Sequence, residues 1–306
     1  MNPLISIIIP LFNQYQVTEQ CLNSIFKKTG IPYELILIDN GSTDGTREKI
    51  SRLEVKDYDQ LKNLQIIYNR DNLGVAKAWN QGIKQANGDF ICICNNDIVV
   101  SKNWLPPLVE QMRSNLNLGM VSPVENFYIR VHAGRNQFPE EYEFLSSRPG
   151  PQPTLESLDE YYNGFERFAA SFTEKYRSQQ YFDELFSIVL IRKELFEEIG
   201  LFEEGFGLAF WEDVDFVQRT LLSEKFSDIM VYPGSYVHHY GNVTSSLFIQ
   251  LGSRQFESSA VNFTRKWGDV GDSIYQKLKM GSLNSEEMKR LRNEIRPLVS
   301  FLNGHT

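Results

Sequence analysis

The chain has 306 residues and is 42% hydrophobic, which is enough apolar material to bury one large core or two ordinary ones. Its formal net charge of -8 argues against a nucleic acid partner, because proteins that bind nucleic acids neutralise phosphates with Lys and Arg. Three cysteines are too few for a secreted disulfide scaffold, and neither a signal peptide nor a membrane-spanning apolar run is present. These features predict a folded cytoplasmic protein.

The first part of the chain alternates between buried strands and helices. Apolar runs predict buried strands, and apolar residues at three- and four-residue intervals predict helices. In chain order we expect a strand at 4–11, a helix at 17–30, a strand at 33–38, a helix at 45–53, a strand at 64–68, a helix at 75–87 and a strand from residue 90. Such β-α-β alternation predicts an α/β fold with a mostly parallel sheet flanked by helices.

Residues 127–183 interrupt the alternation, and we expect them to form an insertion. Prolines make its beginning loop-like, whereas residues 155–176 carry the apolar spacing of a helix. Further elements are predicted as a strand at 185–191, a helix at 193–199, a glycine-rich loop at 205–207, a strand at 229–232 and two helical patterns from residue 247 onward. The insertion and the tail therefore fall outside the regular β-α pattern.

The C-terminal tail carries several basic residues on its helical patterns, namely Lys277, Lys279, Lys289, Arg290, Arg292 and Arg296. Two interpretations remain open. These side chains could make peripheral contact with an anionic membrane surface, or they could form an ordinary solvated helix face, which we favour.

Polar residues follow each of the first four predicted strands. They are Asn13, the segment 39–44, the segment 70–72 and the segment 95–97. Because parallel strands bring these ends to one edge of the sheet, we expect a polar crevice suited to a ribose, a base edge and a metal-bound diphosphate. Each cluster could also be a simple turn. Neither the dinucleotide-binding G-x-G-x-x-G nor the P-loop motif occurs in the sequence.

Six motifs, in order and spacing, resemble the family 2 glycosyltransferases of the GT-A fold, in particular a bacterial branch of rhamnosyltransferase-like enzymes. The motifs are SIIIPLFNQ, LILIDNGSTDGT, NRDNLGVAKAWNQGI, CNNDIVV, FEEGFGLAFWEDVDFVQR and VHHYGNVTS. The resemblance covers about residues 4–126 and 184–246. It implies a nucleoside-diphosphate-sugar donor, a divalent metal and inversion at the anomeric carbon.

The resemblance also implies roles for individual residues of the donor pocket. It assigns the nucleotide pocket to Pro10, Phe12, Asn13, Asp39, Asp44, Asn72 and Asn80. In this assignment Asp39 hydrogen-bonds the base or the ribose of the nucleotide.

The family's metal-binding D-x-D motif corresponds to Asn95, Asn96 and Asp97, with Asp97 at the metal-binding position. Asn95 departs from the pattern, and a neutral amide oxygen is a weaker ligand than a carboxylate for Mn²⁺ or Mg²⁺. His238 and His239 resemble the position at which these enzymes often supply a histidine to the metal or the diphosphate. Adjacent strand residues face opposite ways, so we expect at most one of the two to reach the site.

The segment from Trp211 to Asp215 matches the family's E-D-x-D motif, which implies that Asp213 is the general base, with Glu212 as the other candidate. We expect Asp213 to be ionised without special tuning, in a wet and metal-bearing cleft. The alternative is a helix N-terminus at which acidic residues favour the positive end of the helix dipole.

Together these features predict a metal-assisted inverting glycosyltransferase that moves a sugar from a UDP- or dTDP-linked donor to a glycan, a lipid-linked sugar or a protein. Residues 1–126 would form the nucleotide-sugar half, residues 127–246 the acceptor half and residues 247–306 a helical extension. Its expected location is the cytoplasm, with contact at the inner face of the membrane left open. A sugar nucleotidyltransferase is an alternative, although the Gly- and Arg-rich N-terminal loop of such enzymes is absent. A catalytically inactive binding or scaffold module is the other alternative, supported by Asn95.

Overall fold

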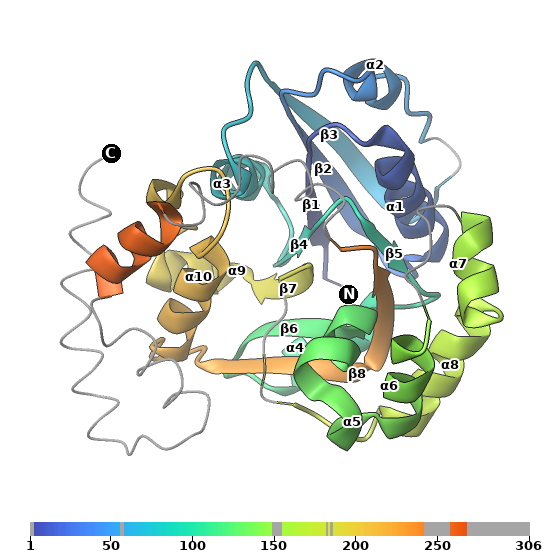
Figure 1. The fold of residues 1–306 in the computed structure, drawn as a ribbon. Helices are drawn as coiled ribbons and strands as arrows, with labels where there is room; N and C mark the ends of the chain where they lie inside the picture. Colours follow the sequence, from blue (N-terminus) through green and yellow to red (C-terminus); the bar gives the residue numbers. More distant parts are fainter. Residues whose placement is uncertain are drawn as a thin grey trace.

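One mixed sheet of eight strands runs through the molecule in the order β3-β2-β1-β4-β7-β6-β8-β5 (Figure 1). In this computed structural model, the described residues are 3–55, 58–148, 155–181, 183, 186–241 and 258–267. The sheet is flanked by helices on both faces, as the α/β pattern predicts. It also joins strands from both predicted halves of the chain, and the division at residue 126 stays a prediction.

The N-terminal part contains the elements predicted from the β-α alternation. They are β1 (Ile5–Leu11), α1 (Tyr15–Lys28), β2 (Tyr33–Asn40), α2 (Thr46–Ile50), β3 (Leu61–Asn69), α3 (Val75–Gln85), β4 (Phe90–Cys94), β5 (Ile98–Val100), α4 (Leu105–Ser114) and β6 (Leu118–Glu125). The predicted strands and helices are confirmed here, with α2 shorter than expected. The sequence prediction missed β5, α4 and β6.

The second part begins with the helices of the insertion. These are the π-helix η1 (Tyr128–Ala133), α5 (Gly134–Gln137), α6 (Pro139–Ser146), α7 (Leu155–Tyr162) and α8 (Phe165–Tyr176). The remaining elements are β7 (Ile188–Arg192), α9 (Lys193–Ile199), the 3-10 helix η2 (Glu204–Phe206), α10 (Glu212–Leu221) and β8 (Asp228–His239), followed by a helical segment at 258–267. The single helix expected over 155–176 is two helices, because Asn163 and Gly164 have positive φ between them.

The first four strands are parallel to one another, and their register brings their C-terminal ends together. Leu11 of β1 pairs with Asp39 of β2, Asn40 of β2 pairs with Asn69 of β3, and β4 runs parallel to β1 on its other side. The polar residues that follow these strands therefore share one edge of the sheet, as parallel pairing predicts. The strands β7 and β5 run antiparallel to their neighbours, so the sheet is not parallel throughout.

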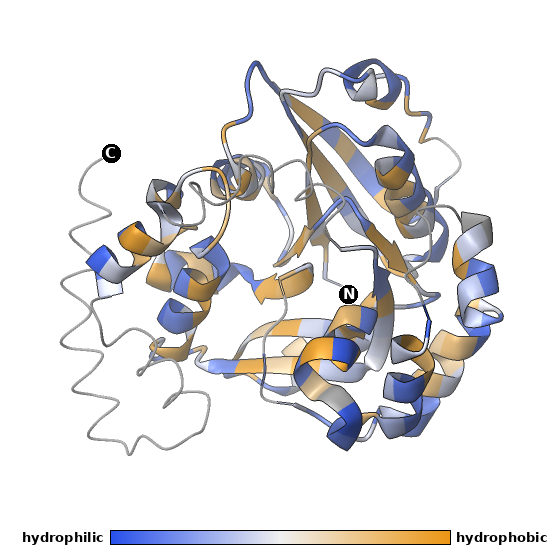
Figure 2. Cartoon of the chain, in the orientation of Figure 1, coloured by the Kyte–Doolittle hydropathy of each residue, from blue (hydrophilic) through white to orange (hydrophobic). Residues whose placement is uncertain are grey.

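Apolar side chains fill both faces of the sheet, and Figure 2 shows the strands as mostly hydrophobic and the outward-facing helix surfaces as mostly hydrophilic. One face packs against α1 and α4 through residues such as Leu22, Ile25 and Leu108. The other packs against α3, α9 and α10, where Trp79 and Phe216 are buried. Burial of these residues holds the helices on the sheet and thus fixes the loops at its edge.

The insertion has its own aromatic core. Tyr162, Phe165 and Phe172 are each at most 4% exposed and pack around Tyr236 of β8. These three side chains were open to two interpretations, packing or contact with an acceptor. Their burial supports packing, because a buried ring offers no surface to a sugar.

Parts of the C-terminal prediction fall outside the described residues. The basic residues of the tail from Lys277 onward lie there, as does most of the two helical patterns. The helix at 258–267 is described and lies beside α10 (Figure 1). Within the ranges that the structure describes, no helix has the length and apolar character needed to cross a bilayer.

Candidate active site

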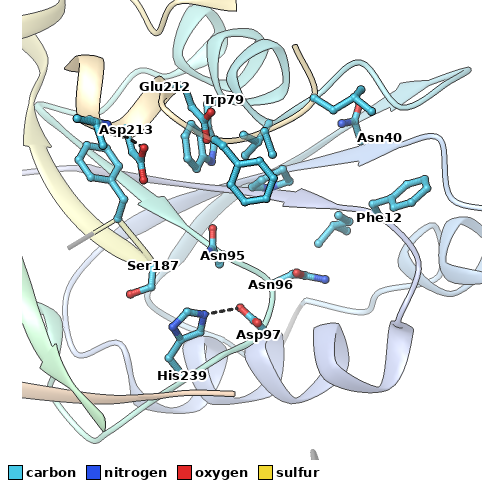
Figure 3. A pocket seen from close by; sticks show the side chains of 18 of the residues that line it. Phe12, Asn40, Trp79, Asn95, Asn96, Asp97, Ser187, Glu212, Asp213 and His239 are labelled. Carbon is cyan, nitrogen blue, oxygen red and sulfur yellow. Dashed lines mark hydrogen bonds and ion pairs between the residues drawn. The ribbon is translucent and has the colours of Figure 1, made fainter. Parts of the chain in front are cut away.

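A cavity of about 730 Å³ opens where the ends of β1 and β4 face the first turn of α10. Its walls come from the strand-end loops, from the residues just before β7, from the C-terminal ends of β6 and β8, from η1 and α3, and from the segment that leads into α10 together with α10 itself. Figure 3 shows Glu212 and Asp213 on one side of this cavity, Asp97 and His239 on the other, and Asn95 between them. The polar residues expected from the sequence to share a site are thus brought together from distant parts of the chain.

The loop after β4 places Asp97 at the cavity wall. Asn95 donates its backbone N–H to the carbonyl of Ser187 at 2.7 Å, and the carbonyl of Asp97 accepts from the N–H of Tyr240 at 3.0 Å. The Asn96 side chain is anchored by a 2.9 Å hydrogen bond from its Nδ2 to Thr18 Oγ1. The backbone of this loop is therefore held from both sides, which fixes the Asp97 carboxylate against the cavity.

His239 lies between two carboxylates. Its Nε2 is 3.2 Å from Asp97 Oδ1 and its Nδ1 is 3.3 Å from Glu125 Oε2. Burial alone would lower the pKa of His239, but the charges of Glu125 and Asp97 raise it well above its ordinary value. Asn126 fixes the backbone of His239 by accepting its N–H and donating to its carbonyl. The site thus concentrates negative charge around one imidazole.

The donor atoms on this wall fit a divalent cation in their chemistry. A carboxylate, an amide carbonyl and an imidazole are ligands that Mn²⁺ accepts, and Mg²⁺ is bound in many enzymes by one or two carboxylates together with substrate phosphates. Among the described residues no group of three or more acidic, His or Cys side chains is arranged as a ready metal site. Asp97 and His239 are two side chains on this wall that could ligate a metal ion.

His238 faces the other way from His239, as the alternation along β8 requires. It is fully buried, its Nδ1 lies 2.9 Å from the Tyr162 hydroxyl, and burial lowers its pKa well below the ordinary value. The structure therefore places His238 in the core of the insertion and not at the cavity, so it is no longer a candidate metal ligand.

Glu212 and Asp213 occupy the first turn of α10. Glu212 is only 6% exposed, and burial together with the charge of Asp213 raises its pKa to about 8. Burial also raises the pKa of Asp213, although the 2.8 Å hydrogen bond from the N–H of Val214 to its Oδ1 opposes this shift. The expectation of an untuned Asp213 was wrong, because its surroundings are drier than the sequence suggested.

The segment before α10 is held against α3. The N–H of Val75 donates to the carbonyl of Leu208 at 2.9 Å, and Gly74, at φ 91°, approaches Gly207 so closely that a Cβ would lie 2.5 Å from its carbonyl oxygen. Asn80 donates to the carbonyl of Phe202 at 2.9 Å. Asn80 thus positions this segment instead of lining the nucleotide pocket.

Other residues expected at the nucleotide end do not reach the cavity. Asp39 is fully buried, accepts the Nε of Arg47 at 2.6 Å and accepts the N–H of Ser42 at 3.0 Å. Asn13 accepts the N–H of Thr43, and Asp44 accepts that of Thr46 at the start of α2. The side chains of Asp39, Asn13 and Asp44 therefore hold the loops in shape. Asp39 could contact the nucleobase directly only if Arg47 moved away from it.

Nine of the predicted site residues line the cavity, namely Pro10, Phe12, Asn72, Asn95, Asn96, Asp97, Glu212, Asp213 and His239. The structure adds lining residues that the sequence analysis missed, among them Asn40, Trp79, Glu125, Phe127, His132, Phe186 and Ser187. Glu125 could have been found, because it is an acidic residue at the C-terminal end of a largely apolar run, as Asp39 is. The aromatic residues carry no such signal, since aromatic residues are common in any core.

A family model described as glycosyl transferase family 2 matches residues 6–200. The glycosyltransferase GlyG from Streptococcus pneumoniae serotype 4 is 31% identical over 113 residues, which are 37% of this chain and 36% of the relative. The glycosyltransferase AglE from Haloferax volcanii is 35% identical over 105 residues, 34% of this chain and 33% of the relative. The chain thus matches about a third of the length of these curated relatives.

Two solved structures share the fold. GalNAc-T7 with UDP, GalNAc and Mn²⁺ has a TM-score of 0.54 and 16% identity, covering 78% of this chain and 44% of that one. The mannosyltransferase PcManGT from Pyrobaculum calidifontis, with GDP-Man and Mn²⁺, has a TM-score of 0.53 and 12% identity, covering 99% and 86%. These similarities show the GT-A fold, and the family match covers more than half of the 306 residues. The chain therefore belongs to glycosyl transferase family 2.

Proposed function

We propose that this protein is a metal-assisted inverting glycosyltransferase that uses a UDP- or dTDP-linked sugar. The observation that carries the proposal is the arrangement of the two cavity walls. Asp97 and His239 form one wall, and Glu212 and Asp213 form the other, around a space of about 730 Å³ (Figure 3). A diphosphate held at the first wall leaves its sugar directed toward the carboxylates of the second.

The donor side follows from the charges of the first wall. Asp97 and His239 would hold Mn²⁺ or Mg²⁺, which when bound would offset the charge of the leaving diphosphate. Pro10 and Phe12 offer apolar surface for the base, and Asn40 and Asn72 offer amide groups to the ribose. Both solved neighbours contain Mn²⁺ together with a nucleotide or a nucleotide sugar, which supports this assignment.

The second wall supplies the base. Asp213 takes the proton of the acceptor hydroxyl while that oxygen attacks the anomeric carbon from the face opposite the leaving nucleoside diphosphate, so the configuration inverts. Glu212, with a pKa near 8, is mostly protonated at pH 7 and suits a hydrogen-bond donor better than a base. This division of roles follows from the different environments of two neighbouring carboxyl groups.

The acceptor enters from the side of the insertion. Phe127, 41% exposed, and His132 line the cavity at the π-helix η1, a type of helix that is frequent at functional sites. An exposed aromatic ring can stack against the apolar face of a sugar. We propose a glycan, a lipid-linked sugar or a protein as the acceptor. A lipid-linked sugar would bring the enzyme to the cytoplasmic face of a membrane.

The test is a calorimetric titration of UDP and dTDP with and without Mn²⁺, followed by a hydrolysis and transfer assay with the matching sugar donors. Metal-dependent nucleotide binding and release of the nucleoside diphosphate are expected. Binding without any turnover would instead favour an inactive binding module, the alternative supported by Asn95 and by the pairing of Asp39 with Arg47. Absence of nucleotide binding would contradict both functions.

A further inference from the structure

Asp215 lies behind the cavity wall, in the first turn of α10, and is fully buried. Its Oδ2 accepts the Nε of Arg219 at 2.9 Å, one turn along the same helix. Its Oδ1 lies 2.6 Å from Lys266 Nζ and accepts Trp267 Nε1 at 2.9 Å. Burial alone would raise the pKa of Asp215, but Arg219 and Lys266 lower it, so the carboxylate stays charged. Two of its three partners come from the helix at 258–267.

The same helix also holds the segment 203–211 that leads into α10. Ser259 Oγ lies 2.6 Å from the carbonyl of Phe206 and 3.0 Å from that of Ala209. Asn262 Nδ2 donates to the carbonyl of Gly205 at 2.9 Å. Three backbone carbonyls outside any sheet or long helix thus accept hydrogen bonds from side chains of helix 258–267, and these bonds hold the segment in place.

The segment needs such support because of its backbone. Phe210 and Trp211 have φ of 77° and 74°, a left-handed conformation that is costly for bulky residues and persists only when the surroundings enforce it. Phe263 of helix 258–267 packs on Trp211 with 4.6 Å between ring centroids. Phe210 lines the cavity, so this enforced turn sets both the shape of the wall and the position of the residues that follow.

We propose that helix 258–267 is a positioning element for the Glu212–Asp213 pair, and that it acts through Asp215, Lys266 and Trp267. This inference rests on the proposed function in one respect, namely that the pair acts on the acceptor. None of these three residues is among those that line the cavity. They fix the first turn of α10 from behind, and a displacement of reacting groups by about 1 Å can cost about 100-fold in rate. The family match ends at residue 200 and so does not include this helix.

The experiment compares three variants of the full chain. Lys266→Met removes one cation of the Asp215 cluster and keeps an unbranched side chain, while Trp267→Phe removes only the indole donor and some ring area. The matched control is Arg265→Met, which removes a neighbouring exposed cation whose only described polar contact is with Asn262 on the same helix. Hydrolysis and transfer are measured with UDP-glucose, UDP-N-acetylglucosamine and dTDP-rhamnose, and amide hydrogen exchange is measured across residues 203–215.

Lys266→Met is expected to lower kcat by about 10- to 100-fold, while the KM for the donor stays within about twofold. Trp267→Phe should lower kcat by a smaller factor. Both variants should speed amide exchange at residues 203–215 and leave exchange in β1 and β4 unchanged, and Arg265→Met should match the wild type. If the Lys266 variant does not fold, the Trp267 variant carries the test with the same readouts.

Wild-type kcat and exchange in both folded variants would overturn the inference. So would a uniform loss, in which donor KM, kcat and exchange throughout the sheet all change together, because that outcome indicates a general structural role. If the wild type turns over none of the three donors although it binds UDP or dTDP, the proposed activity fails separately. Amide exchange at 203–215 then decides alone whether helix 258–267 positions this segment.

Discussion

The two walls of the cavity both carry carboxyl groups, but in the part of the chain that the structure describes only those of the first wall have a basic side chain beside them. On the strand-end wall, Asp97 and Glu125 share His239, whose pKa they raise well above its ordinary value. On the α10 wall, Glu212 and Asp213 face the cavity without an ion-pair partner among the described residues, and their own pKa values are raised. The first wall therefore stabilises the protonated imidazole of His239, whereas burial on the second wall makes ionisation of its carboxyl groups less favourable.

The difference shows why two acidic clusters in one cavity need not do the same chemistry. Carboxylates that stabilise a protonated imidazole also favour a metal cation at the same place, as proposed for the first wall. Burial without a cation raises the pKa of a carboxyl group, and a general acid or base works best when its pKa is close to the working pH. The sequence shows only the acids in both places. The neighbours of each carboxyl group separate the two functions.

The largest effect is expected from Asp213→Asn, which removes the proposed base of the second wall and keeps its shape. Loss of a positioned general base typically lowers kcat by about 10²- to 10⁴-fold, or about 3–5 kcal/mol of barrier. Donor binding should stay normal, because Asp213 is not on the diphosphate side. Steady-state kinetics together with a donor titration measures both quantities.

Glu212→Gln is the control for this variant. If Asp213→Asn turns over normally while Glu212→Gln is inactive, the base is Glu212 and the assignment within the pair is reversed. If both turn over normally, the pair is only an acidic helix start, and the contrast between the two walls has no catalytic meaning.

A second prediction concerns stability and uses the raised pKa of Glu212. The folded pKa is about 8 and the ordinary value is 4.5, so the folded state holds this proton more tightly than the unfolded chain. The stabilisation from this proton is complete below the ordinary value and is lost as pH rises through the folded one. Between the two values the free energy of unfolding therefore falls by about 1.4 kcal/mol per pH unit.

Glu212→Gln abolishes this dependence, because glutamine does not titrate. We expect the variant to be more stable than the wild type by about 2–4 kcal/mol at pH 7, with a difference near zero at pH 4.5. Urea unfolding at several pH values measures the difference. If the difference in free energy of unfolding between the variant and the wild type is the same at every pH in this range, the pKa of Glu212 is not raised in the folded state.

On the first wall, Asp97→Ala should weaken the Mn²⁺-dependent part of nucleotide binding by at least about 10-fold, since even the loss of an outer-shell partner of a metal ligand costs that much. The part of the affinity that needs no metal should persist. Calorimetry of UDP with and without Mn²⁺ separates the two parts. Unchanged metal dependence in a folded variant would remove Asp97 from the metal site.

The smallest effect is expected from Asn95→Asp, which restores a charged oxygen ligand at the first position of the motif. Metal affinity should rise, by less than Asp97→Ala lowers it, because a carboxylate is a stronger ligand than an amide for hard cations. Mn²⁺ titration in the presence of UDP measures the gain. Absence of any gain would show that the side chain of Asn95 does not face the metal.

The N-terminal part of the fold could be predicted because its signal is local. The apolar runs of β1, β2 and β4 and the helical spacing between them are visible in any short window of the sequence. Strand β5 could not be predicted in the same way, since it has three residues and owes its place to antiparallel pairing with β8, more than a hundred residues away.

The sequence allowed us to predict which residues lie at the ends of the strands, but not how their side chains pair. The positions of Asn72 and Asp97 follow from parallel strands, but the pairing of Asp39 with Arg47 depends on side-chain conformations that no pattern specifies. Alternation along β8 predicts that at most one of the two histidines faces the cavity, and the packing of His238 against Tyr162 shows that it is not His238. The contact of Lys266 with Asp215 joins distant parts of the chain and leaves no trace in local sequence.

The most direct test of the two-wall account is anomalous diffraction from Mn²⁺ in crystals of the Asp213→Asn variant grown with UDP or dTDP and Mn²⁺. The account predicts a single strong peak beside Asp97 and His239, in contact with the diphosphate, with Glu212 and residue 213 free of metal. A peak between Glu212 and residue 213, or a diphosphate bound away from Asp97, would contradict it.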